Sequence, residues 1–295
     1  MKVSVTLFLM TQKGFRVVES LAAEYLKCIS AVVSSRDSKV QKDYYDEIKQ
    51  ICKERDVRFY DRKENPVVDS LYAFAISWRW LLSPLSSRLI VFHDSLLPRY
   101  RGFNPLVSAL INEDEQIGVT ACFAATKREY DRGDIIAQSR SRISYPIKIQ
   151  EAIDVVAGNY VELVNRILEA LNQGEVLQST RQDESEATYS LWRDDEDYRI
   201  EWSQSAAYIK RFIDAVGFPY QGALTLVDGI KARVMDAEVV EDVNIVNRVP
   251  GKVIFFEDSL PIVVCGQGLL KIKNLVADGY DKSLLPLPRF RMRFK

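Results

Sequence analysis

The stretch 89-LIVFHDSLLPRYRG-102 places a short apolar run directly before a loop rich in Pro, Arg and Gly. The run Leu89–Phe92 is short and apolar, which is typical of a buried strand. His93, the only histidine of the chain, ends this strand. Open α/β sheets bind ligands outside the carboxyl ends of their strands, so the loop that begins at His93 is the first candidate site.

Before this stretch, strand-like and helix-like segments alternate. The expected strands are Val3–Met10, Ile29–Ser34, Val57–Tyr60 and Leu71–Ser77, and the expected helices are about Gly14–Tyr25 and Lys39–Arg55. Such alternation predicts an α/β fold in which helices cover both faces of a mostly parallel sheet.

After the stretch the pattern changes. Asn104 and Pro105 are typical of the N-cap and the first residue of a helix, which we expect to run to Asn112. The segments expected next are a strand pair, Gly118–Ala124 and Ile135–Ser144, around the turn Lys127–Asp134, and then a helix, Ile149–Asn172. We predict three parts: an α/β domain over residues 1–178, an acidic connector over 179–199, and a small β-rich, barrel-like domain over 200–295.

Composition narrows the classes of protein. The chain has 295 residues, with 40 Lys and Arg against 41 Asp and Glu, and this balance does not favour nucleic-acid binding. Its four cysteines lie far apart without a CxxC pair, so we expect neither a metal site nor disulfides, but reduced thiols in the cytoplasm. The apolar run near the N-terminus is too short to span a membrane, and we expect no membrane association.

Two titratable side chains stand out in the first half. His93 ends a strand, and Asp131 lies in the turn 130-YDRGD-134. Imidazole titrates near neutral pH, and a carboxylate beside it can raise its pKa, which suits acid–base chemistry. Both residues also have ordinary interpretations, because a lone histidine is often only packed and a turn aspartate is often only solvated.

Three motifs occur in order: HDSLLPRYRG (93–102), ALINEDEQIGVT (109–120) and YDRGDIIAQ (130–138). Together they closely resemble the folate-dependent formyltransferases. Further along, ATYSLWRDDEDYRIEW (187–202), RFIDAVGFPYQGA (211–223) and CGQGLLKI (265–272) resemble the companion domain of the longer family members. The resemblance covers nearly the whole chain and implies a Rossmann-like catalytic domain that binds N10-formyltetrahydrofolate beside a substrate amine.

The resemblance also implies roles for individual residues. His93 matches the family's active-site histidine and would hydrogen-bond the developing oxyanion or relay a proton, while Asp131 would take the amine proton and orient His93. The residues expected at the folate are Trp78, Arg79, Leu97, Arg99, Tyr100, Arg101 and Gly102. Phe218 and Tyr220 are candidates for stacking on a nucleotide base. For Trp78 and Arg79, plain packing is an equally ordinary use, and for the aromatic pair, packing in a turn is the commoner use.

One position departs from the family pattern. The family motif is Asn-x-His, and this chain has Val91 in place of the asparagine. Valine offers no side-chain donor, so one contact to the oxyanion is missing. What replaces it is open, and a protein that binds folate or nucleotide-sugar without catalysis is one alternative.

The acceptor is expected to be a nucleotide-linked amino sugar, as in lipopolysaccharide O-antigen biosynthesis. The rival is methionyl-tRNA. The balanced charge and the acidic connector argue against tRNA, because they would repel phosphates. The nucleotide, the sugar and the formylated amine stay open, and so does the oligomeric state, for which a homodimer is one option.

Overall fold

The structure is a computed structural model that describes the whole chain except residues 1–2, 39, 83–86, 126–129 and 280–281. The chain forms two compact units. The first comprises Met1–Leu106, Glu115–Ile143 and Glu151–Leu191, and the second comprises Val107–Asp114, Ser144–Gln150 and Trp192–Lys295.

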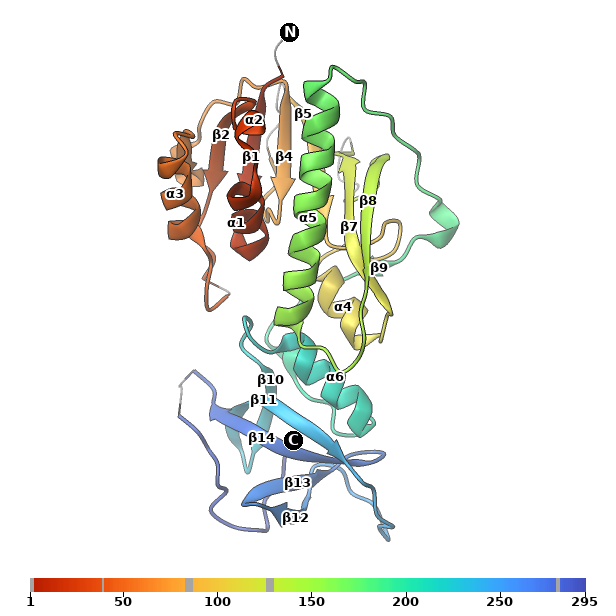
Figure 1. The fold of residues 1–295 in the computed structure, drawn as a ribbon. Helices are drawn as coiled ribbons and strands as arrows, with labels where there is room; N and C mark the ends of the chain where they lie inside the picture. The colour runs from red at the N-terminus through yellow and green to blue at the C-terminus, as the bar shows by residue number, and fades with distance from the viewer. Residues whose placement is uncertain (1–2, 39, 83–86, 126–129, 280–281) are drawn as a thin grey trace. The chain divides into compact units, whose positions relative to one another are not determined.

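The first unit is built on a seven-stranded sheet with the order β3-β2-β1-β4-β5-β7-β8 (Figure 1). Its strands are β1 (Val5–Leu9), β2 (Ile29–Ser34), β3 (Phe59–Asp61), β4 (Tyr72–Ile76), β5 (Arg88–His93), β7 (Gln116–Phe123) and β8 (Ile135–Arg142). The strands β1 to β5 pair in parallel. Strand β7 pairs antiparallel with both of its neighbours, β5 and β8. The expected mostly parallel sheet is confirmed. The strand order reverses between β1 and β4, which is where ligands bind in sheets of this kind.

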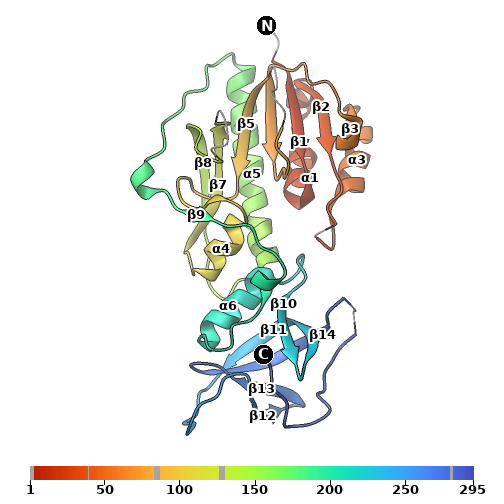
Figure 2. The ribbon, with the colours of Figure 1, turned by 180° about the vertical axis from the view of Figure 1, so that it is seen from behind.

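Helices complete this unit. They are α1 (Thr11–Ser20), α2 (Ala23–Leu26), α3 (Tyr45–Glu54) and nearly all of α5 (Ile149–Asn172), with short 3-10 turns at Arg62–Glu64 and Glu184–Glu186. Most of α4 (Pro105–Ile111) belongs to the second unit. The two views show α1, α3 and α5 on the same face of the sheet (Figures 1 and 2). The long helix α5 buries an apolar stripe at spacings of three and four, which includes Ala152, Val156, Tyr160, Leu163, Ile167 and Leu171.

The other face of the sheet is covered differently. Successive strand residues point to opposite faces, so Phe8 lies opposite its neighbour Leu9, which packs under α1 at Gly14. Phe8 instead packs in an apolar cluster with side chains from the segments that follow β3 and β4, among them Val68 and Trp78. Among the described residues, connecting segments therefore cover this part of the second face, in place of the long helices that the alternation predicted.

Helix α3 starts later than expected, at Tyr45 instead of residue 39, which itself lies outside the described residues. The carboxylate of Asp43 accepts the backbone N–H groups of Tyr45 and Asp37, which forms a local turn. Such side-chain bonds compete with helix formation. The expected turn between β7 and β8 includes residues 127–129, which are also outside the described part.

The second unit contains α6 (Ala206–Val216), a 3-10 turn (Glu196–Tyr198) and a five-stranded antiparallel sheet with the order β10-β11-β14-β13-β12. These strands are β10 (Ala223–Val227), β11 (Ile230–Val240), β12 (Val253–Glu257), β13 (Leu260–Val264) and β14 (Leu269–Ala277). Near the end of the chain, Phe294 pairs with Val227 and Arg293 pairs with Lys252, so the tail links β10 to the segment before β12. The expected β-rich C-terminal domain is confirmed. No described helix has the length and apolar character needed to span a membrane.

Candidate active site

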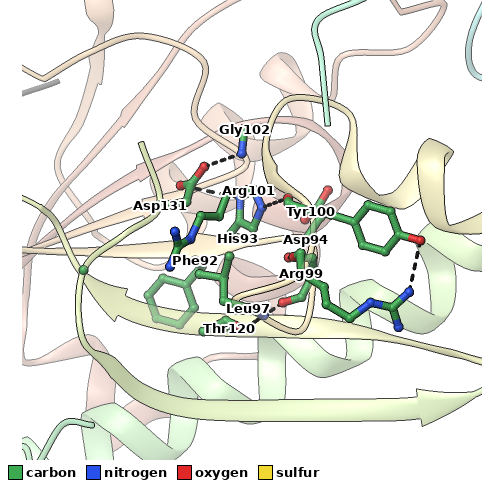
Figure 3. Close-up of polar contacts among 12 residues, drawn as sticks. Phe92, His93, Asp94, Leu97, Arg99, Tyr100, Arg101, Gly102, Thr120 and Asp131 are labelled. Carbon is green, nitrogen blue, oxygen red and sulfur yellow. Dashed lines mark hydrogen bonds and ion pairs between the residues drawn. The ribbon is translucent and has the colours of Figure 1, made fainter. Parts of the chain in front are cut away.

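His93 lies at the carboxyl end of β5 and is 8% exposed. Its Nε2 is 2.8 Å from the carbonyl oxygen of Tyr100, and its Nδ1 is 3.6 Å from Oδ1 of Asp131 (Figure 3). A carbonyl only accepts, so Nε2 carries a proton and donates it to Tyr100. Nδ1 is therefore the ring nitrogen that faces the Asp131 carboxylate, at a distance that exceeds a direct hydrogen bond.

Asp131 occupies a fixed turn. Its φ is +57°, in the left-handed region that Asp tolerates better than most residues. Its Oδ2 accepts the backbone N–H of Gly102 at 2.9 Å, and the Gln182 side chain donates to the carbonyls of Asp131 and Gly133, both at 2.7 Å. A Cβ at Gly133 would lie 1.6 Å from the carbonyl oxygen of Phe123, so this turn requires glycine there. Oδ1 remains the carboxylate oxygen that points toward His93.

The loop after His93 is held by two polar side chains of the antiparallel strands. Thr120 accepts the backbone N–H of Leu97 at 3.0 Å and donates to the carbonyl of Ser95 at 2.7 Å. Gln138 donates to the carbonyl of Leu97 at 2.8 Å. Leu97 itself is 3% exposed, so its side chain belongs to the support of the loop.

Arg101 is fully buried, and its guanidinium is occupied by the protein. It donates to Gln182 at 2.8 and 3.0 Å, to Glu184 at 2.9 Å twice, and to the Tyr189 hydroxyl at 3.2 Å. The bond from Arg101 lowers the pKa of the Glu184 carboxyl. The structure thus ties Arg101 to residues 182–189.

The other predicted folate residues are spread along the sheet edge. Arg99 is exposed and donates to the Tyr100 hydroxyl at 3.4 Å, and Arg79 forms an ion pair with Asp37. Trp78 packs edge-on against Phe8 with ring centroids 5.2 Å apart. Its buried Nε1 has no hydrogen-bond partner among the described residues.

Phe218 and Tyr220 belong to the second unit. Phe218 is 47% exposed, and Tyr220 is half-buried. Their assignment to a nucleotide base stays a prediction.

Two family models match this chain. The one described as formyl transferase matches residues 71–174, and the one described as formyl transferase, C-terminal domain, matches residues 193–283. Together they cover more than half of the chain, including both His93 and Asp131. The chain belongs to the formyltransferase family.

Sequence relatives of this chain are named for methionyl-tRNA, whereas its structural neighbours include a sugar 3N-formyltransferase. The methionyl-tRNA formyltransferase of Caldanaerobacter subterraneus is 32% identical over 190 residues, which cover 64% of this chain and 59% of that protein. The one from Streptococcus sanguinis is 30% identical over 193 residues, which cover 65% of this chain and 60% of that protein. The chain thus matches about three fifths of the length of these curated relatives.

Among solved structures, WlaRD, a sugar 3N-formyltransferase crystallised with dTDP and 5-N-formyl-THF, superposes with a TM-score of 0.64 at 15% identity, covering 96% of this chain and 99% of that one. HypX from Aquifex aeolicus in complex with tetrahydrofolic acid gives a TM-score of 0.61 at 18% identity, covering 96% of this chain and 45% of that one. At such identities, the likeness shows a shared fold.

The sequence reasoning missed a buried polar group behind His93. The carboxylate of Asp94 accepts from the ammonium of Lys13, at the start of α1, and from the hydroxyl of Tyr160 in α5. Burial alone would raise the pKa of Asp94, but Lys13 and Tyr160 outweigh it and hold that pKa below its usual value. Asp94 could have been noticed beside His93 in the motif. Its partners are 81 and 66 residues away, and no sequence signal links them.

Val91 lies two residues before His93 on β5, so both side chains point to the same face of the sheet. Its neighbour on β7 is Cys122, whose pKa burial raises to about 12, with a further contribution from the charge of Asp131. The thiol therefore stays protonated. All four cysteines are free and buried, and the described residues contain no group of His, Cys, Asp and Glu that could hold a metal ion.

Proposed function

We propose that this chain is an N-formyltransferase that moves a formyl group from N10-formyltetrahydrofolate to the amine of a nucleotide-linked amino sugar. The observation that carries the proposal is the His93–Asp131 pair at the end of β5, with Nδ1 and Oδ1 3.6 Å apart. It places a proton donor and a carboxylate base around one point at the ligand-binding edge of the sheet.

Each member of the pair has one atom fixed and one atom available. Oδ2 of Asp131 is taken by Gly102, so Oδ1 accepts the proton that the amine loses as it attacks the formyl carbon. Nε2 of His93 is taken by Tyr100, so Nδ1 of the protonated ring donates to the formyl oxygen as negative charge develops on it. N10-formyltetrahydrofolate supplies the formyl carbon, and its N10 takes up a proton when the C–N10 bond breaks.

The chain offers a fit for folate at the end of β4. The buried indole N–H of Trp78 lacks a partner among the described residues, and an unpaired buried donor is costly unless a ligand satisfies it. Trp78 follows β4, next to the strand-order reversal where ligands of such sheets bind. We assign Trp78 to the folate ring, with the exposed Arg99 near the charged end of that ligand.

Charge favours an amino sugar over tRNA. Basic and acidic residues nearly cancel, 40 against 41, whereas proteins that hold polyphosphate backbones gain affinity from a basic surface. The second unit also carries a run of four exposed acidic residues, Asp194–Asp197. We therefore place the product among the nucleotide-sugars used for lipopolysaccharide O-antigen and the reaction in the cytoplasm.

Methionyl-tRNA is the second candidate, because the sequence relatives reported above are methionyl-tRNA formyltransferases. The test is to measure tetrahydrofolate release by the wild-type protein with dTDP-, UDP- and GDP-linked amino sugars and with methionyl-tRNA. We expect turnover with at least one amino sugar and none with the matching sugar that has a hydroxyl in place of the amine. Turnover with methionyl-tRNA alone contradicts the proposal.

A further inference from the structure

Two half-exposed aromatic rings lie close together at the Asp131 turn. Phe103 is 48% exposed and Tyr130 is 51% exposed, with ring centroids 6.1 Å apart and planes at 52°. Each adjoins one end of the hydrogen bond between Gly102 N and Asp131 Oδ2, which is 2.9 Å long. Tyr130 therefore directly precedes Asp131, to which we assign the amine proton, and Phe103 directly follows the residue that hydrogen-bonds the Asp131 carboxylate.

The backbone that carries Phe103 is fixed. The short strands β6 (Arg101–Gly102) and β9 (Tyr189–Ser190) pair in parallel, and the N–H of Phe103 donates to the carbonyl of Ser190 at 3.0 Å. A Cβ at Gly102 would lie 2.6 Å from that same carbonyl oxygen, so the two segments are in close contact. A large apolar ring on a fixed backbone, left half exposed beside a reactive site, is typical of a surface that a ligand covers.

The position of Asp131 indicates which ligand covers Phe103 and Tyr130. A general base must lie within hydrogen-bond reach of the proton that it takes, so the amine of the acceptor lies at Asp131. The ring that bears this amine is then the part of the acceptor closest to Phe103 and Tyr130. In a nucleotide-linked sugar, the base is separated from that ring by two phosphates and a ribose, and it lies further away.

We propose that Phe103 and Tyr130 form an aromatic platform that contacts the apolar face of the amine-bearing hexose and selects for it. This inference rests on the proposed function. Aromatic faces carry partial negative charge, so they attract the slightly positive C–H groups on one face of a pyranose ring. A deoxy sugar exposes more of this apolar surface than a fully hydroxylated one and gains more from the contact.

The experiment compares KM values of the full-length protein for the amino sugar and for N10-formyltetrahydrofolate. Phe103→Ala and Tyr130→Ala are each expected to raise the KM for the sugar about 3- to 10-fold and to leave the KM for folate unchanged. Tyr130→Phe keeps the ring and should stay close to wild type. The matched control is the pair Phe256 and Phe290, which has centroids 6.0 Å apart and planes at 50°, and which lies in the second unit. Phe256→Ala and Phe290→Ala should change neither KM.

Several outcomes overturn the platform. One is an unchanged sugar KM in both Ala variants, and another is a rise in the folate KM in its place. A Tyr130→Phe variant as impaired as Tyr130→Ala would assign the contact to the hydroxyl and not to the ring. The wild-type protein separates this inference from the proposed function: transfer to a sugar with unaffected variants rejects the platform alone, whereas no transfer to any amino sugar rejects both.

Discussion

His93 is held by the Tyr100 carbonyl at Nε2, 2.8 Å away, and this contact turns Nδ1 toward Asp131. The same loop therefore supplies the histidine and the carbonyl that accepts its Nε2–H. Val91, on the same face of β5, has no donor to offer where the family motif has Asn. We infer that the histidine does most of the work of stabilising the oxyanion in this chain.

The first prediction tests that inference. His93→Asn should lower turnover about 10²- to 10³-fold, the usual cost of losing one oxyanion donor, while binding of folate stays measurable. Val91→Asn should change wild-type turnover only a few-fold and should not rescue His93→Asn. Steady-state kinetics and a folate-binding titration check both. If Val91→Asn raises wild-type turnover about a hundredfold, the natural site lacks a donor and His93 does not suffice.

Asn104 was predicted as a helix N-cap, and it directly precedes Pro105, the first residue of α4. Its φ is +49°, so its backbone is left-handed and not extended as in a usual N-cap. Asparagine tolerates this conformation better than most residues. Asn104→Ala therefore serves as a stability control beside His93: it should cost about 1 kcal/mol and spare most of the turnover.

At the scale of elements, one buried ion pair joins three of them. Lys13 comes from α1, Asp94 follows β5, and Tyr160 comes from α5. The side chains of Lys13 and Asp94 are 10% and 17% exposed, so little solvent screens their charges. Because Asp94 is the residue after His93, this group fixes the end of the strand that carries the His93 ring, for which we propose a catalytic role.

A double-mutant cycle tests this group. Lys13→Met leaves the Asp94 carboxylate unpaired and should cost about 3–5 kcal/mol of unfolding free energy, whereas Lys13→Met with Asp94→Asn should recover most of that loss. The folded pKa of Asp94 lies below its unfolded value, so its stabilisation is present above pH about 4 and is lost as the pH falls through the folded pKa. Urea unfolding at several pH values checks both effects. A single variant as stable as wild type would contradict this account.

The sequence predicted those features whose signals lie in a few neighbouring residues. The strand end at His93 and the glycine-containing turn at Asp131 can be read from a few neighbouring residues. It could not show that Arg101 faces Gln182 and Glu184, which are more than 80 residues away, and so it assigned Arg101 to the folate. Likewise, the late start of α3 depends on where the Asp43 carboxylate finds its donors. Contacts of this kind exist only once the chain has folded.

For the whole molecule, the names of the sequence relatives favour tRNA as the acceptor, whereas the charge balance of the chain favours an amino sugar. The sequence relatives act on methionyl-tRNA by name, and the fold is shared with a sugar 3N-formyltransferase over 99% of that chain. The balanced charge decides our choice, because tRNA binding without a basic excess would lack its main source of affinity. The identity of the acceptor is therefore the part of the proposal that experiment can test most directly.

The most direct measurement follows a labelled formyl carbon from N10-formyltetrahydrofolate into products by mass spectrometry, with wild-type protein and with Asp131→Asn. The account predicts that the label appears as a formamide on the amine of a nucleotide-linked amino sugar. It also predicts that Asp131→Asn forms this product about 10²- to 10⁴-fold more slowly, because its carboxylate base is gone. Label that stays on folate, is released as free formate or enters methionyl-tRNA alone would contradict the central claim, and so would an Asp131→Asn variant as fast as wild type.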